Sequence, residues 1–127
     1  MSESVNYILR LRKRWFDAIK NGNKTIEGRL YRNQCQIMKP GDTITFINEK
    51  FSQDEIPDKI MTVIESLIIA DSFSELYSLY EDQLLPRECL TEEELKNPSI
   101  VYDNINDYKN AVENGVKVLG IRIKIVM

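Results

Sequence analysis

Apolar side chains alternate with other side chains in short segments at both ends of the chain. Asn6 to Leu11 reads NYILRL, and Val116 to Val126 ends in the alternating run GIRIKIV. A period of two residues is typical of a strand that buries one face. Three further segments have strand character, at residues 25–30, 43–48 and 59–69. Strands at both ends, with helical patterns between them, indicate an α+β fold, and a small, mostly antiparallel barrel or curled sheet would bury one face of these short strands.

Helical spacing of apolar residues predicts four helices. In the first, residues 12–21, Trp15, Ala18 and Ile19 share one face, and Gly22 is suited to end the helix. We therefore expect Trp15 to pack in the core rather than to stack on a ligand. The other three helices are predicted at residues 72–84, 91–97 and 104–114, and the first two of these open with capping-box patterns.

The length of 127 residues suits one domain, which we expect to span residues 1–127. Its start lacks the basic and apolar regions of a signal peptide, and no apolar run is long enough to span a bilayer. Cys35 and Cys89 form no CxxC pattern, so two reduced thiols are expected. We expect an intracellular protein, cytoplasmic or nuclear, with no membrane contact.

The sequence contains no histidine. This absence excludes Ser-His and Cys-His dyads, imidazole acid–base chemistry and every zinc site that needs a histidine. Phosphate-binding loops, dinucleotide fingerprints and calcium-loop spacings are also missing. We therefore expect no metal and no cofactor, and any chemistry must use Lys, Glu, Asp, Tyr, Ser or Thr.

Charge is distributed unevenly along the chain. Residues 1–39 hold nine Lys and Arg against three acids, so residues 40–127 hold eight bases against seventeen acids. A basic segment in an acidic protein indicates an anionic partner, such as a nucleotide or an RNA backbone. The alternative is that the two parts neutralise each other across the fold.

The stretch GNKTIEGR, residues 22–29, places three charged residues between a predicted helix and a predicted strand. Gly22 permits the positive φ of a sharp turn. Glu27 and Arg29 are two residues apart on a strand, so their side chains leave the same face. Lys24 precedes them, and a lysine that is buried or near other cations can lose its proton near neutral pH and act as a base. The alternative is a Glu27–Arg29 ion pair on a sheet face, with Lys24 in solvent.

The order of segments around this stretch resembles the ASCH domain of the PUA-like superfamily. That family has the hallmark GxKxxExR, whose fixed positions are here Gly22, Lys24, Glu27 and Arg29. The resemblance covers residues 5–126 and includes the segments YILRL, RWFDAIKNG, GNKTIEGRL, MKPGDTITF and VLGIRIKIV. It implies a β-barrel of about five or six strands with helices around a central cleft, which the hallmark residues line.

The resemblance further implies that the cleft binds RNA or a modified nucleotide or nucleoside. Lys24 and Arg29 would meet phosphate or carbonyl oxygens, and Glu27 would read a donor edge or orient the cations. Tyr31 and Arg32 follow the hallmark strand and are candidate rim contacts for the ligand. An ordinary solvated strand end is the alternative for these two residues.

Some members of the family are hydrolases, so a metal-independent hydrolase of a nucleoside amide such as N4-acetylcytidine, or of an RNA phosphodiester, is the alternative function. Lys24 would be its base or electrostatic stabiliser, and Glu27 would activate a water. The amidohydrolase subgroup has a nucleophilic threonine in place of Glu27, whereas here the nearby hydroxyl is that of Thr25, a further candidate ligand contact. The subgroup also uses an acid from the helical region, for which Glu75 and Glu81 are candidates. A third possibility is a protein-interaction module that uses the acidic helical side.

Overall fold

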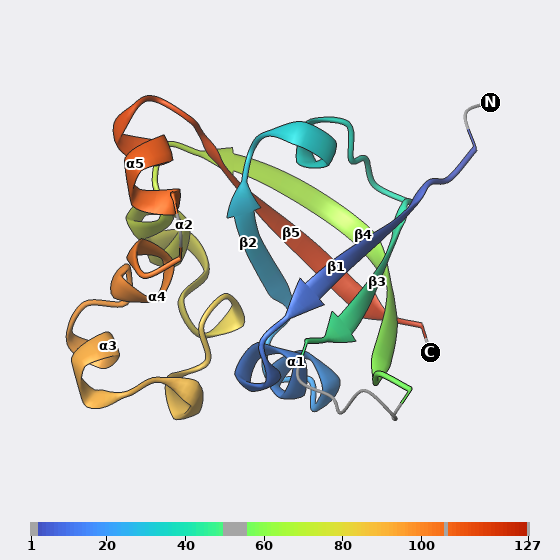
Figure 1. Cartoon of the computed structure of the whole chain (residues 1–127), viewed down its shortest axis with the longest axis horizontal. Coiled ribbons are helices and arrows are strands. Elements are labelled where there is room, and N and C mark those ends of the chain that lie inside the picture. The colour runs from blue at the N-terminus through green and yellow to red at the C-terminus, as the bar shows by residue number, and fades with distance from the viewer. Residues whose placement is uncertain (1–2, 50–55, 106, 127) are drawn as a thin grey trace.

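Figure 1 shows the computed structural model of the chain, which describes residues 3–49, 56–105 and 107–126. Its strands are β1 (Asn6–Leu11), β2 (Ile26–Leu30), β3 (Thr43–Asn48), β4 (Lys59–Ala70) and β5 (Val118–Ile125). Its α-helices are α1 (Lys13–Lys20), α2 (Phe73–Tyr80), α3 (Glu92–Lys96), α4 (Ile100–Asp103) and α5 (Tyr108–Glu113). Single turns of 3-10 helix lie at η1 (Asn33–Gln36), η2 (Glu81–Gln83) and η3 (Arg87–Cys89).

The five strands of the described ranges form one curled sheet in the order β1-β3-β4-β5-β2. β1 runs parallel to β3, and the other three pairings are antiparallel. The 12-residue β4 shifts register between Ile64 and Ser66, and a bulge of this kind bends a strand. The sheet therefore curls into a half-barrel, with the edge strands β1 and β2 on either side of its open seam (Figure 1). This confirms the α+β class and the curled, mostly antiparallel sheet expected from the sequence.

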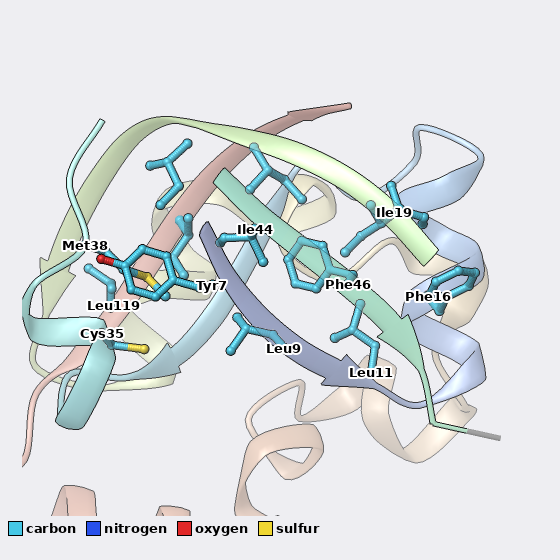
Figure 2. Packing of buried hydrophobic residues seen from close by; sticks show 14 residues of the cluster. Tyr7, Leu9, Leu11, Phe16, Ile19, Cys35, Met38, Ile44, Phe46 and Leu119 are labelled. Carbon is cyan, nitrogen blue, oxygen red and sulfur yellow. The ribbon is translucent and has the colours of Figure 1, made fainter. Parts of the chain in front are cut away.

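A hydrophobic core fills the inside of the half-barrel (Figure 2). β1 contributes alternate residues to it, which is the burial expected from the pattern NYILRL. Phe16 and Ile19 of α1 close one end of this core, while Cys35 and Met38 lie at the other (Figure 2). The helix α1 is thus fixed at the end of the half-barrel, directly before the hallmark residues.

A buried carboxylate holds the turn before β3. Asp42 accepts hydrogen bonds from the backbone N–H groups of Val5 and Lys39, both at 3.0 Å, and from the Tyr7 hydroxyl at 3.3 Å. Burial alone would raise the pKa of Asp42, but the bonds from Val5 and Lys39 outweigh burial and lower it. The Asp42 carboxylate of the KPGD segment therefore holds the turn against the start of β1.

The helices α2 to α5 gather beside β2 (Figure 1), and α2, α4 and α5 form a second core with it and with β5. Ile26, Leu30 and Val118 face Phe73, Leu76 and Leu84 in this cluster of buried residues. Ile26 and Leu30 of β2 face this second core, whereas Glu27 and Arg29, paired with Ile121 and Leu119, face the half-barrel. No helix in the described ranges is long and apolar enough to cross a membrane.

Trp15 packs against both cores, as predicted, and is half-buried because the buried face of α1 centres on Phe16, Ala18 and Ile19. One helix prediction needs correction. The helix predicted at residues 104–114 is shorter, since α4 ends at Asp103 and α5 starts at Tyr108. Asp107 has a φ of 66°, which no α-helix contains, and residue 106 lies outside the described ranges.

Candidate functional site

A cavity of about 230 Å³ opens where α1, β2 and the helical segment meet. Its charged lining residues are Arg10, Arg12, Arg14, Lys24, Arg29, Glu27 and Glu49. Its aromatic lining residues are Trp15, Tyr102 and Tyr108. Three of the four hallmark positions therefore face one cavity, and the fourth, Gly22, forms the turn before it with a φ of 87°.

Lys24 is buried in the wall of this cavity. Only 3% of the residue is exposed, and its ammonium group donates a hydrogen bond to the carbonyl oxygen of Leu84. Its Nζ lies 3.7 Å from Glu27 Oε1 and 5.5 Å from the centre of the Trp15 ring. Burial is the main cause that lowers the pKa of Lys24 from 10.5 to about 8, although Glu27 partly opposes it. The alternative of a solvated Lys24 is therefore wrong.

Glu27 and Arg29 form an ion pair on β2. Arg29 Nε donates to Glu27 Oε2 at 2.7 Å, which confirms that the two side chains leave the same face. Arg29 Nη2 also donates to the backbone carbonyl of Arg10 at 2.9 Å. Because Arg10 belongs to β1, the Arg29 guanidinium bridges the two edge strands of the half-barrel.

Arg14 is held by groups from the far end of the chain. Its Nη1 donates to Glu94 Oε1 at 2.6 Å and to the carbonyl of Cys89 at 3.2 Å. Its guanidinium lies 4.3 Å from the centre of the Trp15 ring, a cation–π geometry. Glu94 also completes the predicted capping box with Thr91, so one carboxylate fixes both the start of α3 and an arginine of the cavity.

Glu27 lines the cavity as predicted, but the two acids suggested from the helical region do not. Glu75 is exposed and accepts from the backbone N–H of Asp71 at the start of α2. Glu81 is exposed in η2, and neither residue lines the cavity. Glu49 is part of the lining instead. Glu94 lies outside the lining and bonds to Arg14, which is part of it.

The other candidate ligand contacts lie apart from the cavity. Thr25 is half-buried, its backbone bonds to Gln83 and Ile123, and it is not part of the lining. Tyr31 packs against the core of the half-barrel. Arg32 lines a second cavity of about 130 Å³, which shares Arg29 with the first. A ligand role for these three residues stays a prediction.

The described ranges hold no group of three or more Cys, Asp or Glu side chains arranged to bind a metal ion. The site instead offers five basic side chains, two carboxylates and the hydroxyls of Tyr102 and Tyr108.

A family model for the ASCH domain matches residues 9–124. The chain belongs to the ASCH domain family.

Solved structures share the fold of this ASCH domain. Hypothetical protein PH0355 superposes with a TM-score of 0.74 at 23% identity, over 96% of this chain and 100% of its own. Protein PF0455 from Pyrococcus furiosus has a TM-score of 0.64 at 25% identity, over 96% and 98%. The ASCH protein from Zymomonas mobilis has a TM-score of 0.59 at 17% identity, over 94% of this chain and 66% of that chain. A search of curated proteins returned no match.

Several lining residues of the ASCH domain were not identified from the sequence. Arg14 was counted only as part of a basic segment, and Trp15 was assigned to the core. No pattern in the sequence assigns a ligand role to Tyr102 or Tyr108. The signal that could have found Arg14 is its position one turn from Ala18, on the margin of the same helix that carries Lys24 into place.

Proposed function

We propose that this ASCH domain binds single-stranded RNA or a modified nucleotide in the cavity around Lys24, Glu27 and Arg29. The observation that carries the proposal is the charge of the lining, in which five bases face two acids within a protein of net charge −3. Positive charge in a concave surface raises the local concentration of anions. Family membership supports the same function, because ASCH domains are broadly linked to RNA binding.

Ion pairs inside the site do not cancel this charge. Glu27 pairs with Arg29, Glu49 lies 3.7 Å from Arg12, and Glu94 outside the lining pairs with Arg14. Five bases still exceed these three acids. The basic N-terminal segment therefore collects at the cavity, which favours an anionic partner over simple neutralisation between the two parts of the chain.

Residues at the rim and residues in the wall of the cavity would contact different parts of the ligand. Arg10 and Arg12 are exposed at the rim, where they would contact phosphates. Arg29 keeps N–H donors beyond those used on Glu27 and Arg10, so it could contact a phosphate or a carbonyl as well. Lys24 and Glu27, deeper in the wall, would contact the base or its modification.

The test compares two double variants with the same loss of charge. Arg10→Gln with Arg12→Gln removes the rim, and Lys59→Gln with Lys124→Gln removes two exposed lysines elsewhere on the sheet. Binding of a labelled 12-nucleotide oligouridylate is followed by fluorescence anisotropy across a range of salt concentrations. We expect the rim variant to bind more weakly and to lower the salt slope by about 1.4, as for two lost contacts to a single strand. Equal losses in both variants would contradict binding at this cavity.

A hydrolase is the second candidate, supported by the position of Lys24 beside Glu27. With a pKa of about 8, a substantial fraction of Lys24 is a neutral amine at pH 8 and could act as a general base. Glu27 Oε1, 3.7 Å away, would orient the water or the cation. Such an enzyme would deacylate a nucleoside amide or cleave an RNA phosphodiester.

The enzyme test is turnover of N4-acetylcytidine and of labelled RNA without added metal. We expect the rate to rise with pH through about 8 as Lys24 loses its proton, and Lys24→Met to abolish it. Lys20→Met, which changes an exposed lysine of α1, is the matched control. No turnover by the wild-type protein across this panel would overturn the hydrolase and leave the binding proposal intact.

A further inference from the structure

Tyr102 presents a hydroxyl to the cavity that has no partner within the protein. The residue is 5% exposed and lines the cavity together with Lys24 and Glu27. Within the described ranges, no hydrogen bond joins its hydroxyl to another residue. A buried tyrosine hydroxyl usually finds a hydrogen-bond partner. The donor and the acceptor of this group are therefore free for a molecule in the cavity.

The ring that carries the hydroxyl is held by close contacts. It stacks on Phe73 with ring centres 3.9 Å apart and planes inclined by 3°. Its hydroxyl end approaches Gly28, where a Cβ atom would come within 2.8 Å of the hydroxyl oxygen. The glycine thus lets the hydroxyl approach the backbone of β2 between Glu27 and Arg29. Burial also raises the pKa of Tyr102 well above 10, so the group is a neutral hydroxyl at physiological pH.

Glu27 offers a complementary acceptor in the same lining. Its Oε2 accepts from Arg29 and its Oε1 forms an ion pair with Lys24 Nζ at 3.7 Å, which leaves lone pairs on Oε1. Oε1 can therefore accept an N–H from a ligand. The hydroxyl reaches the cavity from the face of β2 on which Gly28 lies, and Glu27 reaches it from the opposite face, so a base at this edge of β2 would lie between a donor and an acceptor. The pairing edge of a nucleobase carries an acceptor next to an N–H donor.

We propose that Tyr102 determines ligand specificity in this cavity, with its hydroxyl bonded to the pairing edge of an unpaired nucleobase whose N–H group is accepted by Glu27. This inference rests on the proposed nucleotide binding. It adds that the cavity recognises the base of the nucleotide as well as its phosphate. It also assigns a ligand contact to α4, outside the hallmark. A base in a duplex uses the same edge for its partner strand, so the cavity takes single-stranded or free nucleotides.

The test compares wild-type protein with Tyr102→Phe and with Tyr77→Phe, a tyrosine of α2 that does not line the cavity. Calorimetry measures the affinity of the four nucleoside 5′-monophosphates and of ribose 5-phosphate, which has the phosphate but no base. We expect Tyr102→Phe to weaken the tightest nucleotide about 3- to 10-fold, as for one lost neutral hydrogen bond, and to leave ribose 5-phosphate unchanged. Tyr77→Phe should change neither. The melting temperature should stay the same, because the protein loses no internal hydrogen bond.

A ligand-side experiment gives a second readout that does not depend on the folding of a variant. The tightest nucleotide, methylated on the ring nitrogen of its pairing edge, should bind the wild-type protein several-fold more weakly.

Other outcomes separate the two proposals. If Tyr102→Phe leaves nucleotide affinity within twofold while the rim variant weakens it, the base-edge contact is wrong and nucleotide binding stands. If Tyr102→Phe lowers the affinity for the nucleotide and for ribose 5-phosphate alike, the hydroxyl contacts the sugar phosphate. This result also overturns the inference. If the wild-type protein binds neither the nucleotides nor the oligouridylate, the proposed function fails and the inference fails with it.

Discussion

The burial of Lys24 leads to a pH dependence of stability that can be isolated by one substitution. In the folded protein its pKa is about 8, against 10.5 when it is in solvent. Below pH 8 the lysine is protonated in both states, and the folded state carries the full cost of a buried cation. Between pH 8 and 10.5 the unfolded state binds more protons than the folded state, so the free energy of unfolding rises with pH.

The size of this effect follows from the separation of the two pKa values. Each pKa unit corresponds to about 1.4 kcal/mol, so the full difference amounts to about 3 kcal/mol once both states are deprotonated. Most of it lies within reach of an experiment. Between pH 7 and pH 9.5 we expect the wild-type protein to gain about 2 kcal/mol relative to Lys24→Met, which keeps the length of the side chain without a titrating group.

The measurement is urea unfolding of both proteins at several pH values in this range. Only the difference between the two free energies is interpreted, because other groups titrate in the same window; burial raises the pKa of Cys35, for example. Lys20→Met removes an exposed lysine and should give a difference that is independent of pH. A flat or falling difference for Lys24→Met would refute the buried, destabilised cation described above.

Substitutions at three positions test contacts of the site and of the turn before β3, each measured by urea unfolding. Gly28→Ala should lower the free energy of unfolding by about 1–3 kcal/mol, because its Cβ would lie 2.8 Å from the Tyr102 hydroxyl oxygen. No loss would mean that Tyr102 moves away freely. Arg29→Gln should cost about 2 kcal/mol, since it breaks the bonds to Glu27 and to the backbone of β1. Arg29→Lys should recover only part of this, and full recovery would show that charge rather than the guanidinium fork matters. Asp42→Asn should cost about 2 kcal/mol near neutral pH, and the difference from wild type should shrink as Asp42 is protonated in acid. A difference that stays constant down to pH 2 would contradict the stabilising role of the ionised Asp42 carboxylate.

The parts of the site that the sequence predicts are those fixed by local geometry. Strand alternation places Glu27 and Arg29 on one face whatever surrounds them, and a glycine at the end of α1 turns the chain into Lys24. The burial of Lys24 depends on Leu84, whose carbonyl accepts a hydrogen bond from the ammonium group and which lies 60 residues further along the chain. Tyr102 lies still further along the chain, and the four-residue helix α4 that carries it is too short to show a clear apolar face. Such contacts arise from tertiary packing, which the local pattern does not contain.

The open seam of the half-barrel explains why the charged residues collect there. A closed barrel would pair β1 with β2 and satisfy the backbone groups of both edges. Here the Arg10 carbonyl is bonded by the Arg29 side chain instead, which leaves the space between the two edges to the cavity. Arg29 thus holds the seam together with the same group that faces the proposed ligand. A ligand phosphate that bonds its free N–H groups would add to this bridge, so nucleotide binding should stabilise the packing of β1 against β2. Amide hydrogen exchange in both edge strands should then slow when nucleotide is added, whereas a ligand that binds elsewhere would leave these amides unchanged.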